Sequence, residues 1–221
     1  MAPTLYYCDP SCPSRGALLT AHSVPAAKVA LKSISLFNKE HLTPEFIKIN
    51  PQHTVPVLTD GDLTICDSHV ISTYLVEKYA PDDSLYPKDL KARTLVDQRL
   101  YFDAATLFPK IRGICFPVLF RGKTTVDADL KEGIHDGLSF LEKYLEGKPW
   151  VAGDKMTIAD FACVASVTSV VELKFDMSKY PNVNAWLSRC EKEIPGYAEF
   201  NDKGAKQLGN AVLSKLQPNQ I

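Results

Sequence analysis

A turn near the start of the chain carries the side chains best suited to chemistry. Asp9 to Ser14 reads Asp-Pro-Ser-Cys-Pro-Ser, and the apolar spacing that follows is typical of a helix. The first N–H groups of a helix are unpaired and attract anions, so polar side chains there can serve a ligand. Ser11 or Ser14 could do so, or could simply cap the helix. Cys12 competes, because a thiol at a helix N-terminus has a lowered pKa and can act as a nucleophile.

A second segment, Asn50 to His69, combines a hairpin with another helix start. Asp60-Gly61 stands between two strand-like runs and is a strong signal for a tight hairpin turn. Pro56 lies where a strand should pair, although proline donates no backbone hydrogen bond. A cis Val55–Pro56 bond would leave the Val55 N–H and C=O free to pair with an extended peptide. Asp67-Ser68 then opens a helix whose N–H groups could bind a carboxylate, and the alternative is an ordinary edge hairpin.

Together these segments resemble the cytosolic glutathione S-transferases. The run Asn50 to Leu58, followed by Asp67-Ser68-His69, is most similar to the insect delta and epsilon classes, and His69 favours epsilon. The resemblance implies a thioredoxin-like domain whose cis-proline exposes Val55 to the cysteinyl backbone of glutathione. It also implies that glutathione is bound by His41, His53, Val55, Pro56, Asp67, Ser68 and His69.

The same resemblance assigns the catalytic residue. Ser11 matches the serine whose hydroxyl donates a hydrogen bond to the glutathione sulfur and favours the thiolate. Cys12 falls one place after that serine, with no resolving cysteine at the usual spacing. Omega-class transferases use a cysteine at the start of this helix, so a Cys12-dependent thiol reductase is an alternative. Aspartate at position 67, where glutamate is common, shortens the reach to the γ-glutamyl amine and could weaken binding.

The elements that would position these residues follow a recognisable order. Thr4 to Cys8 predicts a strand, Ser14 to Ser23 a crossover helix, and Val29 to Lys32 a second strand. Thr43-Pro44 opens a short helix, since a proline in the first turn loses no hydrogen bond. The hairpin and a helix ending near Tyr79 complete the order strand, helix, strand, helix, strand, strand, helix. In this interpretation Lys39, His41, His53 and Arg15 are scattered through the loops.

The rest of the chain reads as helices alone. Leu90 to about Phe120 predicts a long helical stretch, interrupted at Pro109 and near Pro117. An apolar stripe from Leu130 to Leu145 predicts an amphipathic helix. A capping box at Thr157–Asp160 opens a helix that is apolar nearly all round and should be central and buried. We predict an α/β thioredoxin-like domain over residues 1–80, a linker over 81–89 and an all-helical domain over 90–221.

The long helical stretch would face the first domain across a cleft. Most of its apolar residues are expected in the bundle core, but Arg112 among them is unusual, because a guanidinium is seldom buried without an anion. The resemblance puts Arg112 and Phe116 at the cleft, where a hydrophobic electrophile would bind. The predicted electrophile pocket comprises Phe108, Ile111, Arg112, Cys115, Phe116, Leu119 and Phe120.

The amino-acid composition limits the partners, the location and the metal sites that the chain could have. The 25 Lys and Arg residues nearly balance 26 acidic residues, which argues against binding to nucleic acid or an anionic membrane. The chain has no run of 18 apolar residues and no secretory leader, so we expect a soluble, cytoplasmic protein. Its six cysteines show neither zinc spacing nor a Cys-x-x-Cys motif, so we expect free thiols and no metal site.

The sequence therefore predicts a glutathione transferase that conjugates the glutathione thiolate to hydrophobic electrophiles in xenobiotic detoxification. Glutathione would be a co-substrate, and no other cofactor is expected. From the resemblance we also expect a homodimer. An alternative is a protein of the same fold that binds hydrophobic ligands without catalysis.

Overall fold

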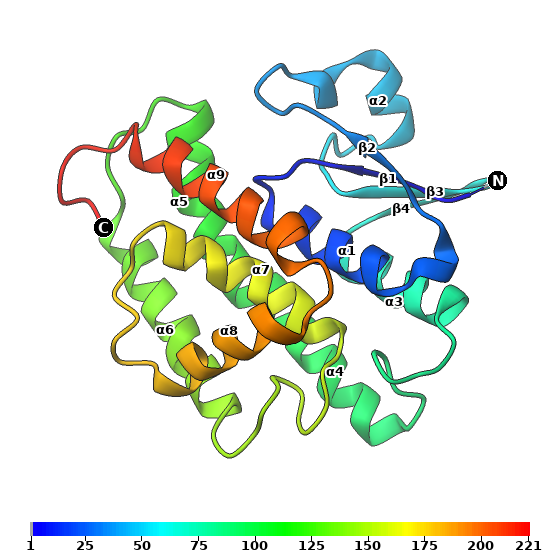
Figure 1. The fold of residues 1–221 in the computed structure, drawn as a ribbon. Helices are drawn as coiled ribbons and strands as arrows, with labels where there is room; N and C mark the ends of the chain where they lie inside the picture. Colours follow the sequence, from blue (N-terminus) through cyan, green and yellow to red (C-terminus); the bar gives the residue numbers. More distant parts are fainter. Residues whose placement is uncertain (1) are drawn as a thin grey trace.

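The first part of the chain forms a four-stranded mixed sheet (Figure 1). In the computed structural model, which describes residues 2–221, the strand order is β2-β1-β3-β4. β1 pairs in parallel with β2 and antiparallel with β3, and β3 and β4 form an antiparallel hairpin. The strands are β1 (Thr4–Tyr7), β2 (Ala30–Ser33), β3 (Val57–Asp60) and β4 (Leu63–Cys66).

Three helices flank this sheet on two sides. The short α2 (Pro44–Ile49) lies over one face, where Phe46 packs with Ile34 and Val57 in a small apolar cluster. The helices α1 (Cys12–Ser23) and α3 (Ser68–Tyr79) lie over the other face and pack against each other (Figure 1). The observed order confirms the predicted one, and we call β1 to α3 the sheet domain.

Local sequence signals account for these elements. Gly61 has φ of 63° in the turn between β3 and β4, a conformation that glycine adopts without strain. The Thr43 hydroxyl accepts a hydrogen bond from the Phe46 N–H and caps α2, with Pro44 in the first turn. The Val55–Pro56 bond is cis. These features confirm the predicted hairpin, short helix and cis bond.

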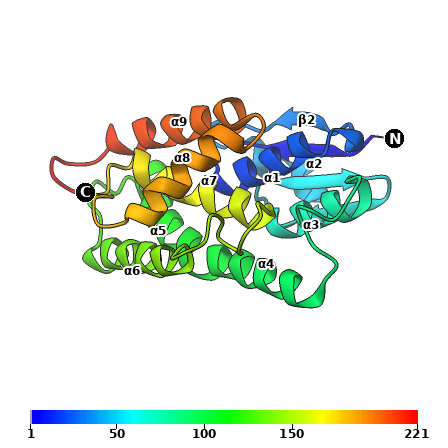
Figure 2. The same ribbon diagram turned by 60° about the horizontal axis from the view of Figure 1, so that its bottom comes forward.

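The helical domain, from α4 onward, is built around one buried helix. In α7 every residue from Ile158 to Val170 except Ala162 is buried. The Asp160 carboxylate holds the start of α7, accepting hydrogen bonds from the Thr157 N–H and from the Trp186 indole. The prediction of a capped central helix is thereby confirmed (Figure 2). The helices are α4 (Leu90–Phe102), α5 (Phe108–Phe120), α6 (Ala128–Tyr144), α7 (Ile158–Glu172), α8 (Pro181–Glu193) and α9 (Lys203–Leu213).

The stretch from α4 to α5 is interrupted, but the predicted position of the break is wrong. A π-helical turn at Asp103–Leu107 separates the two helices. Pro109 lies in the first turn of α5, where its missing N–H costs nothing, and α5 continues through Pro117. A second π-helical turn, Ala198–Asp202, precedes α9.

The two domains meet along α1. This helix packs against α3 within the sheet domain and against α7 in the helical domain. The π-helical turn at Ala198–Asp202 also contacts α1. The start of α1, where the candidate Ser11 lies, is therefore supported from both domains. No helix among residues 2–221 is long and apolar enough to cross a membrane.

Candidate functional site

Ser11 caps the first turn of α1 and keeps a hydrogen to donate. Its backbone N–H donates to the Cys8 carbonyl at 3.0 Å, which fixes the turn. Its Oγ accepts from the Ser14 N–H at 3.5 Å, a long bond that uses only a lone pair. Ser11 is partly exposed, whereas Ser14 is fully buried and accepts from the Cys8 N–H. The capping role and the ligand role inferred for Ser11 are thus compatible.

Cys12 is placed differently from its neighbour. Only 5% of this residue is exposed, and burial raises the pKa of its thiol to about 11 although nearby Arg15 acts to lower it. The lowered pKa expected at a helix N-terminus is therefore not found, because desolvation outweighs the effect of the helix end. A thiol held protonated in this way is a poor nucleophile.

The loop before β3 presents backbone and imidazole groups. Buried Asn50 organises it, since its amide donates to the Thr54 carbonyl at 3.0 Å and its carbonyl accepts from the Gln52 N–H at 2.9 Å. Along residues 2–221, no hydrogen bond engages the Val55 N–H or C=O. Exposed His53 has φ of 45° and follows this turn. The backbone of Val55 is therefore available for pairing, as the sequence predicted.

His41 approaches His53 from the loop between β2 and α2. The two rings lie 6.4 Å apart between centroids. Burial, with a smaller effect from His53, lowers the pKa of His41. Its buried Nδ1 has no partner within the described chain. The pair can offer two N–H or N acceptor groups to one ligand.

The start of α3 carries the other predicted binding residues. The Asp67 carboxylate accepts from the N–H groups of His69 at 2.9 Å and Val70 at 3.1 Å, so one of its oxygens caps the helix. Its hydrogen bonds to His69, set against burial, lower the pKa of Asp67. Ser68 is buried beside Cys12 and lines a cavity of about 10 Å³, which holds at most one water.

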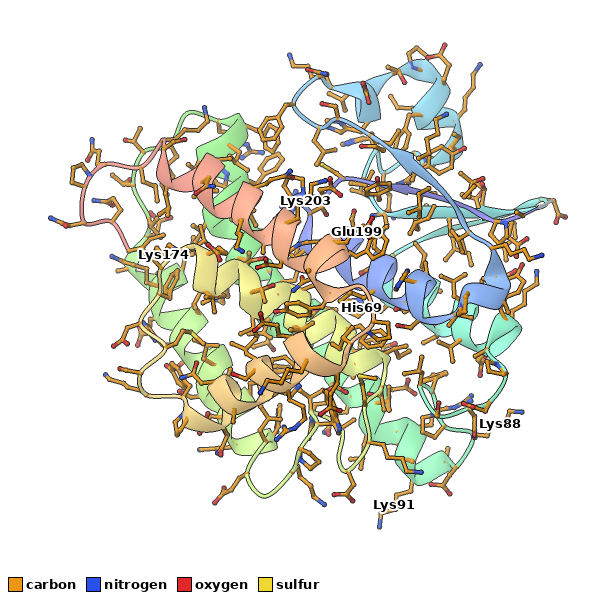
Figure 3. The ribbon with its side chains drawn as sticks, in the orientation of Figure 1. His69, Lys88, Lys91, Lys174, Glu199 and Lys203 are labelled. Carbon is orange, nitrogen blue, oxygen red and sulfur yellow. The ribbon has the colours of Figure 1, made fainter. Side chains whose placement is uncertain are left out.

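His69 connects this helix to the helical domain. Its Nε2 lies 2.9 Å from Oδ2 of buried Asp103, and its Nδ1 lies 3.5 Å from Asp67. Burial opposes the charge, but the hydrogen bonds to Asp103 and Asp67 raise the pKa of His69 to about 9. His69 is therefore a cation at neutral pH and lies where the two domains meet (Figure 3). Asp103 was not identified from the sequence.

Arg15 makes another polar contact between the domains. The sequence analysis placed it in a loop, but it lies in α1 and is fully buried. Its Nη1 donates to Oδ1 of Asn201 at 2.9 Å, and its Nη2 donates to the Ala165 carbonyl at 2.8 Å. Further acceptors are the Asn201 carbonyl and the hydroxyls of Thr168 and Ser169. Burial lowers the pKa of Arg15, and no carboxylate binds it in the described residues.

The loop that leads to Ser11 also rests on the start of α9. A Cβ added at Gly204 would overlap the Asp9 carbonyl and lie 2.8 Å from Cδ of Arg15. Glycine is therefore required for this close approach. Exposed Lys203 lies 3.9 Å from the Asp9 carboxylate, and Figure 3 labels Lys203 at the start of α9 and Glu199 in the preceding π-helical turn.

The predicted electrophile residues divide between two faces of α5. Ile111 and Cys115 are 1% and 6% exposed and belong to the bundle core, so they have little surface to offer a ligand. Phe108, Phe116 and Leu119 are half-buried, and Arg112 and Phe120 are exposed. Arg112 is therefore not the buried guanidinium that the sequence suggested. Its guanidinium carbon lies 4.7 Å from the centre of the Phe116 ring.

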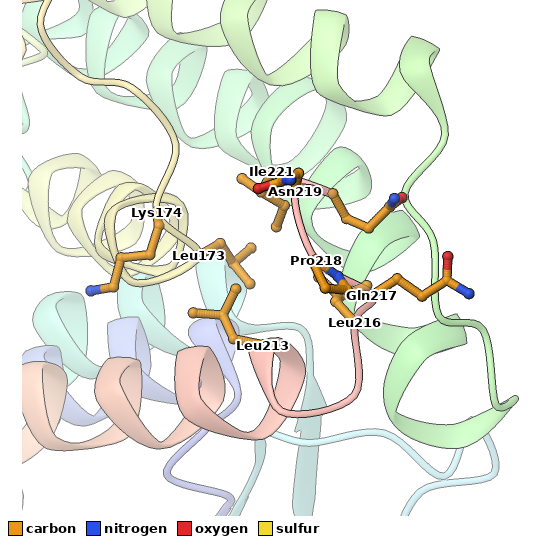
Figure 4. A pocket seen from close by; sticks show the side chains of 9 residues that line it. Leu173, Lys174, Leu213, Leu216, Gln217, Pro218, Asn219 and Ile221 are labelled. Atoms are coloured by element: carbon orange, nitrogen blue, oxygen red, sulfur yellow. The ribbon is translucent and has the colours of Figure 1, made fainter.

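A larger cavity, of about 280 Å³, lies at the far end of the helical domain (Figure 4). It is lined by the ends of α7 and α9 and by the C-terminal tail, including Leu173, Lys174 and Ile221. It contains none of the predicted site residues. Within residues 2–221, no group of three or more His, Cys, Asp or Glu side chains could hold a metal ion.

Comparison with known proteins gives a consistent result along the chain. Residues 17–83 match the N-terminal domain of glutathione S-transferases, and residues 95–193 match the C-terminal domain. The chain is 42% identical over 218 residues to glutathione S-transferase 1 of Manduca sexta, covering 98% of this chain and 100% of that protein.

Solved structures agree with this match. An epsilon-class glutathione S-transferase from the housefly Musca domestica has a TM-score of 0.91 and 46% identity, covering 96% of this chain and 98% of that one. A delta-class transferase from Nilaparvata lugens has a TM-score of 0.91 and 43% identity, covering 96% and 99%. A homologue from Drosophila mojavensis with bound glutathione has a TM-score of 0.91 and 43% identity, covering 97% of each chain. Both classes match at similar levels.

Proposed function

The chain belongs to the glutathione S-transferase family, and we propose that Ser11 activates glutathione held on the sheet domain. The family relationship makes the protein a glutathione transferase, an enzyme that joins the glutathione thiolate to electrophiles. The observation that carries the assignment of Ser11 is its partly exposed hydroxyl at the start of α1, with a hydrogen still free to donate.

The proposed chemistry at Ser11 is stabilisation of the sulfur anion. A free thiol has a pKa near ~8.5, so only a few per cent is ionised at neutral pH. A hydroxyl that donates to S⁻ at a helix N-terminus would lower that pKa by roughly one to two pH units. This corresponds to about 1.4–2.7 kcal/mol of stabilisation of the thiolate. The thiolate then attacks the electrophile, and the leaving group departs with its electron pair.

The remaining predicted residues would hold the tripeptide. The free N–H and C=O of Val55, beside Pro56, suit the cysteinyl backbone, and His41 and His53 suit the glycyl carboxylate. Asp67 and Ser68 would bind the γ-glutamyl group, with His69 held beside them by Asp103. The second oxygen of Asp67, which its helix does not use, remains for the glutamyl amine.

The electrophile would lie against the accessible face of α5, next to the thiolate. We propose that Phe108, Arg112, Phe116, Leu119 and Phe120 form this wall, and that Ile111 and Cys115 support it from the core. Detoxification of apolar foreign compounds follows as the proposed role. We further propose the division into residues 1–80, a linker 81–89 and residues 90–221, and a cytoplasmic location.

A homodimer is also proposed. The outer surfaces of α3 and α4 leave Val70 52%, Leu90 78% and Tyr101 74% exposed, and such apolar groups suit burial against a second copy. Sedimentation at micromolar concentration tests this, and a single species near the chain mass of 24.5 kDa would refute it.

The assignment of Ser11 is tested by a pair of adjacent substitutions. Ser11→Ala should cut conjugation of an aryl halide and raise the pKa of bound glutathione, followed by thiolate absorbance. Cys12→Ala should leave both nearly unchanged, because the buried thiol has no part in the reaction. If Cys12→Ala abolishes activity while Ser11→Ala retains it, the enzyme is instead a thiol reductase. Binding of ligands by wild type without any turnover would identify a non-catalytic binding protein.

A further inference from the structure

One face of α5 carries an alternating set of aromatic and cationic side chains. Phe108, Arg112, Phe116 and Phe120 are spaced four residues apart, so they lie one above another on the helix surface, and we call them the α5 row. Each of the four is at least partly exposed. The buried residues of α5, such as Ile111 and Ile114, face the core on the opposite side.

Two arginines share one ring in this row. The guanidinium carbon of Arg112 lies 4.7 Å from the centre of the Phe116 ring, and that of Arg121 lies 5.1 Å from it. Along the described chain, neither guanidinium forms an ion pair with a carboxylate or a hydrogen bond to another side chain. Both keep all their N–H donors available at an aromatic surface.

The row is continued by the sheet domain. Phe120 lies 5.3 Å from Phe116 and 5.5 Å from Phe37, measured between ring centroids. Phe37 is 51% exposed and stands in the loop after β2, four residues before His41. Three phenylalanine rings from two domains therefore form one partly exposed aromatic surface beside two unpaired guanidinium groups.

This surface lies toward the turn that carries Ser11. The Ile34 N–H donates to the Tyr7 carbonyl at 2.7 Å, so the loop that carries Phe37 leaves the sheet beside the end of β1, which leads to Ser11. An aromatic electrophile that stacks on the α5 row next to Phe37 would therefore lie on the side of the sheet domain where the thiolate is proposed.

We propose that the enzyme favours aromatic electrophiles that carry an anionic group, with Arg112 as the main anion partner and Arg121 as the second. This proposal rests on the proposed function and names the substrate class of the same site. Phenyl rings bind flat aromatic molecules by stacking, and a free guanidinium binds a carboxylate through two parallel hydrogen bonds. A purely apolar electrophile would use the rings and leave the arginines without a role.

The test compares two aryl chlorides that differ in charge, 1-chloro-2,4-dinitrobenzene and 4-chloro-3,5-dinitrobenzoate. In both, the glutathione sulfur forms a bond to the ring carbon and chloride leaves with the electron pair. Arg112→Gln should raise the KM for the benzoate about tenfold, because one charge-assisted contact is lost, and should leave the KM values for the neutral chloride and for glutathione within about twofold. Arg121→Gln should act in the same direction with a smaller effect, and Arg112→Lys should retain part of the preference.

Lys192→Gln, an exposed charge removed from α8, is the matched control and should change neither substrate. Equal increases in both KM values would overturn the proposal, since Arg112 would then act only as part of the wall. Unchanged KM values in both arginine variants would overturn it as well. If wild type conjugates neither chloride, the proposed transferase chemistry itself fails, and the inference falls with it.

Discussion

Two of the polar contacts between the sheet domain and the helical domain are built in opposite ways. Arg15 from α1 is a buried cation whose described partners are all neutral oxygens. His69 from α3 is a partly buried cation that faces the carboxylate of buried Asp103. Both partners, Asn201 and Asp103, come from π-helical turns, the segments of the helical domain that depart from regular α-helix.

These two contacts differ in how they respond to pH. An arginine stays protonated at any pH that the protein meets, and its neutral partners do not titrate. The His69–Asp103 contact depends on a proton that leaves as the pH passes about 9. The Arg15 contact therefore persists at any pH, whereas the His69 contact depends on pH. Arg15 lies four residues after Ser11, and His69 is itself a proposed glutathione-binding residue.

The largest effect should come from Arg15→Leu. The substitution removes the guanidinium that donates to Asn201, Thr168, Ala165 and Ser169 in a buried position, so we expect a loss of about 3–5 kcal/mol in the free energy of unfolding, measured in urea. Arg121→Leu, at an exposed position, is the control and should cost less than about 0.5 kcal/mol. Equal stability of the two variants would show that the contact is not a structural link.

Gly204→Ala should be next in size. The added Cβ would overlap the backbone carbonyl of Asp9, which cannot move away without shifting the turn that carries Ser11. We expect a loss of about 2–3 kcal/mol in stability together with a lower kcat. Gly133→Ala on α6 is the matched control, because its Cβ would meet only the flexible end of Lys110, and it should leave kcat unchanged.

The His69–Asp103 contact should give stability a pH dependence. Since the pKa of His69 is raised, its contribution is fully present below pH 6.5 and is lost as the pH rises through about 9, by roughly 3 kcal/mol at most. Asp103→Asn should lower the stability at pH 7 by about 1–3 kcal/mol and flatten the profile between pH 6.5 and 9. A wild-type profile that is already flat across this window would contradict the assignment.

The smallest effect should come from Lys203→Ala. This side chain is largely exposed and its Nζ lies 3.9 Å from the Asp9 carboxylate, so solvent screens the pair. Urea unfolding should show a change below about 0.5 kcal/mol. A larger loss would mean that surface charge, and not only the buried contacts, holds α9 against the Ser11 turn.

The features predicted correctly from the sequence are those with local causes. The Asp60-Gly61 turn, the Thr43-Pro44 helix start and the capping box of α7 each involve residues within a few positions of one another. Their hydrogen bonds are decided by short-range geometry, so the sequence pattern was sufficient.

The features that were missed depend on distant partners. Arg15 and Asn201 are 186 positions apart, and nothing near Arg15 indicates that its partner is an asparagine in a π-helical turn. Asp103 lies within a stretch that reads as continuous helix, so its approach to His69 was not visible. The apolar residues of α5 are visible in the sequence, but only packing against α7 and α9 shows that Ile111 and Cys115 face inward while Arg112 is exposed.

The burial of the cysteines affects how readily the enzyme is inactivated by its own electrophilic substrates. An enzyme that brings electrophiles to a thiolate risks alkylation of its own thiols, and this chain has six. Five are buried and Cys66 is partly buried, and burial raises the pKa of all six. Protonated thiols are poor competitors for an electrophile, so the reactive sulfur in the site is that of the substrate, and the protein is spared self-inactivation over many turnovers.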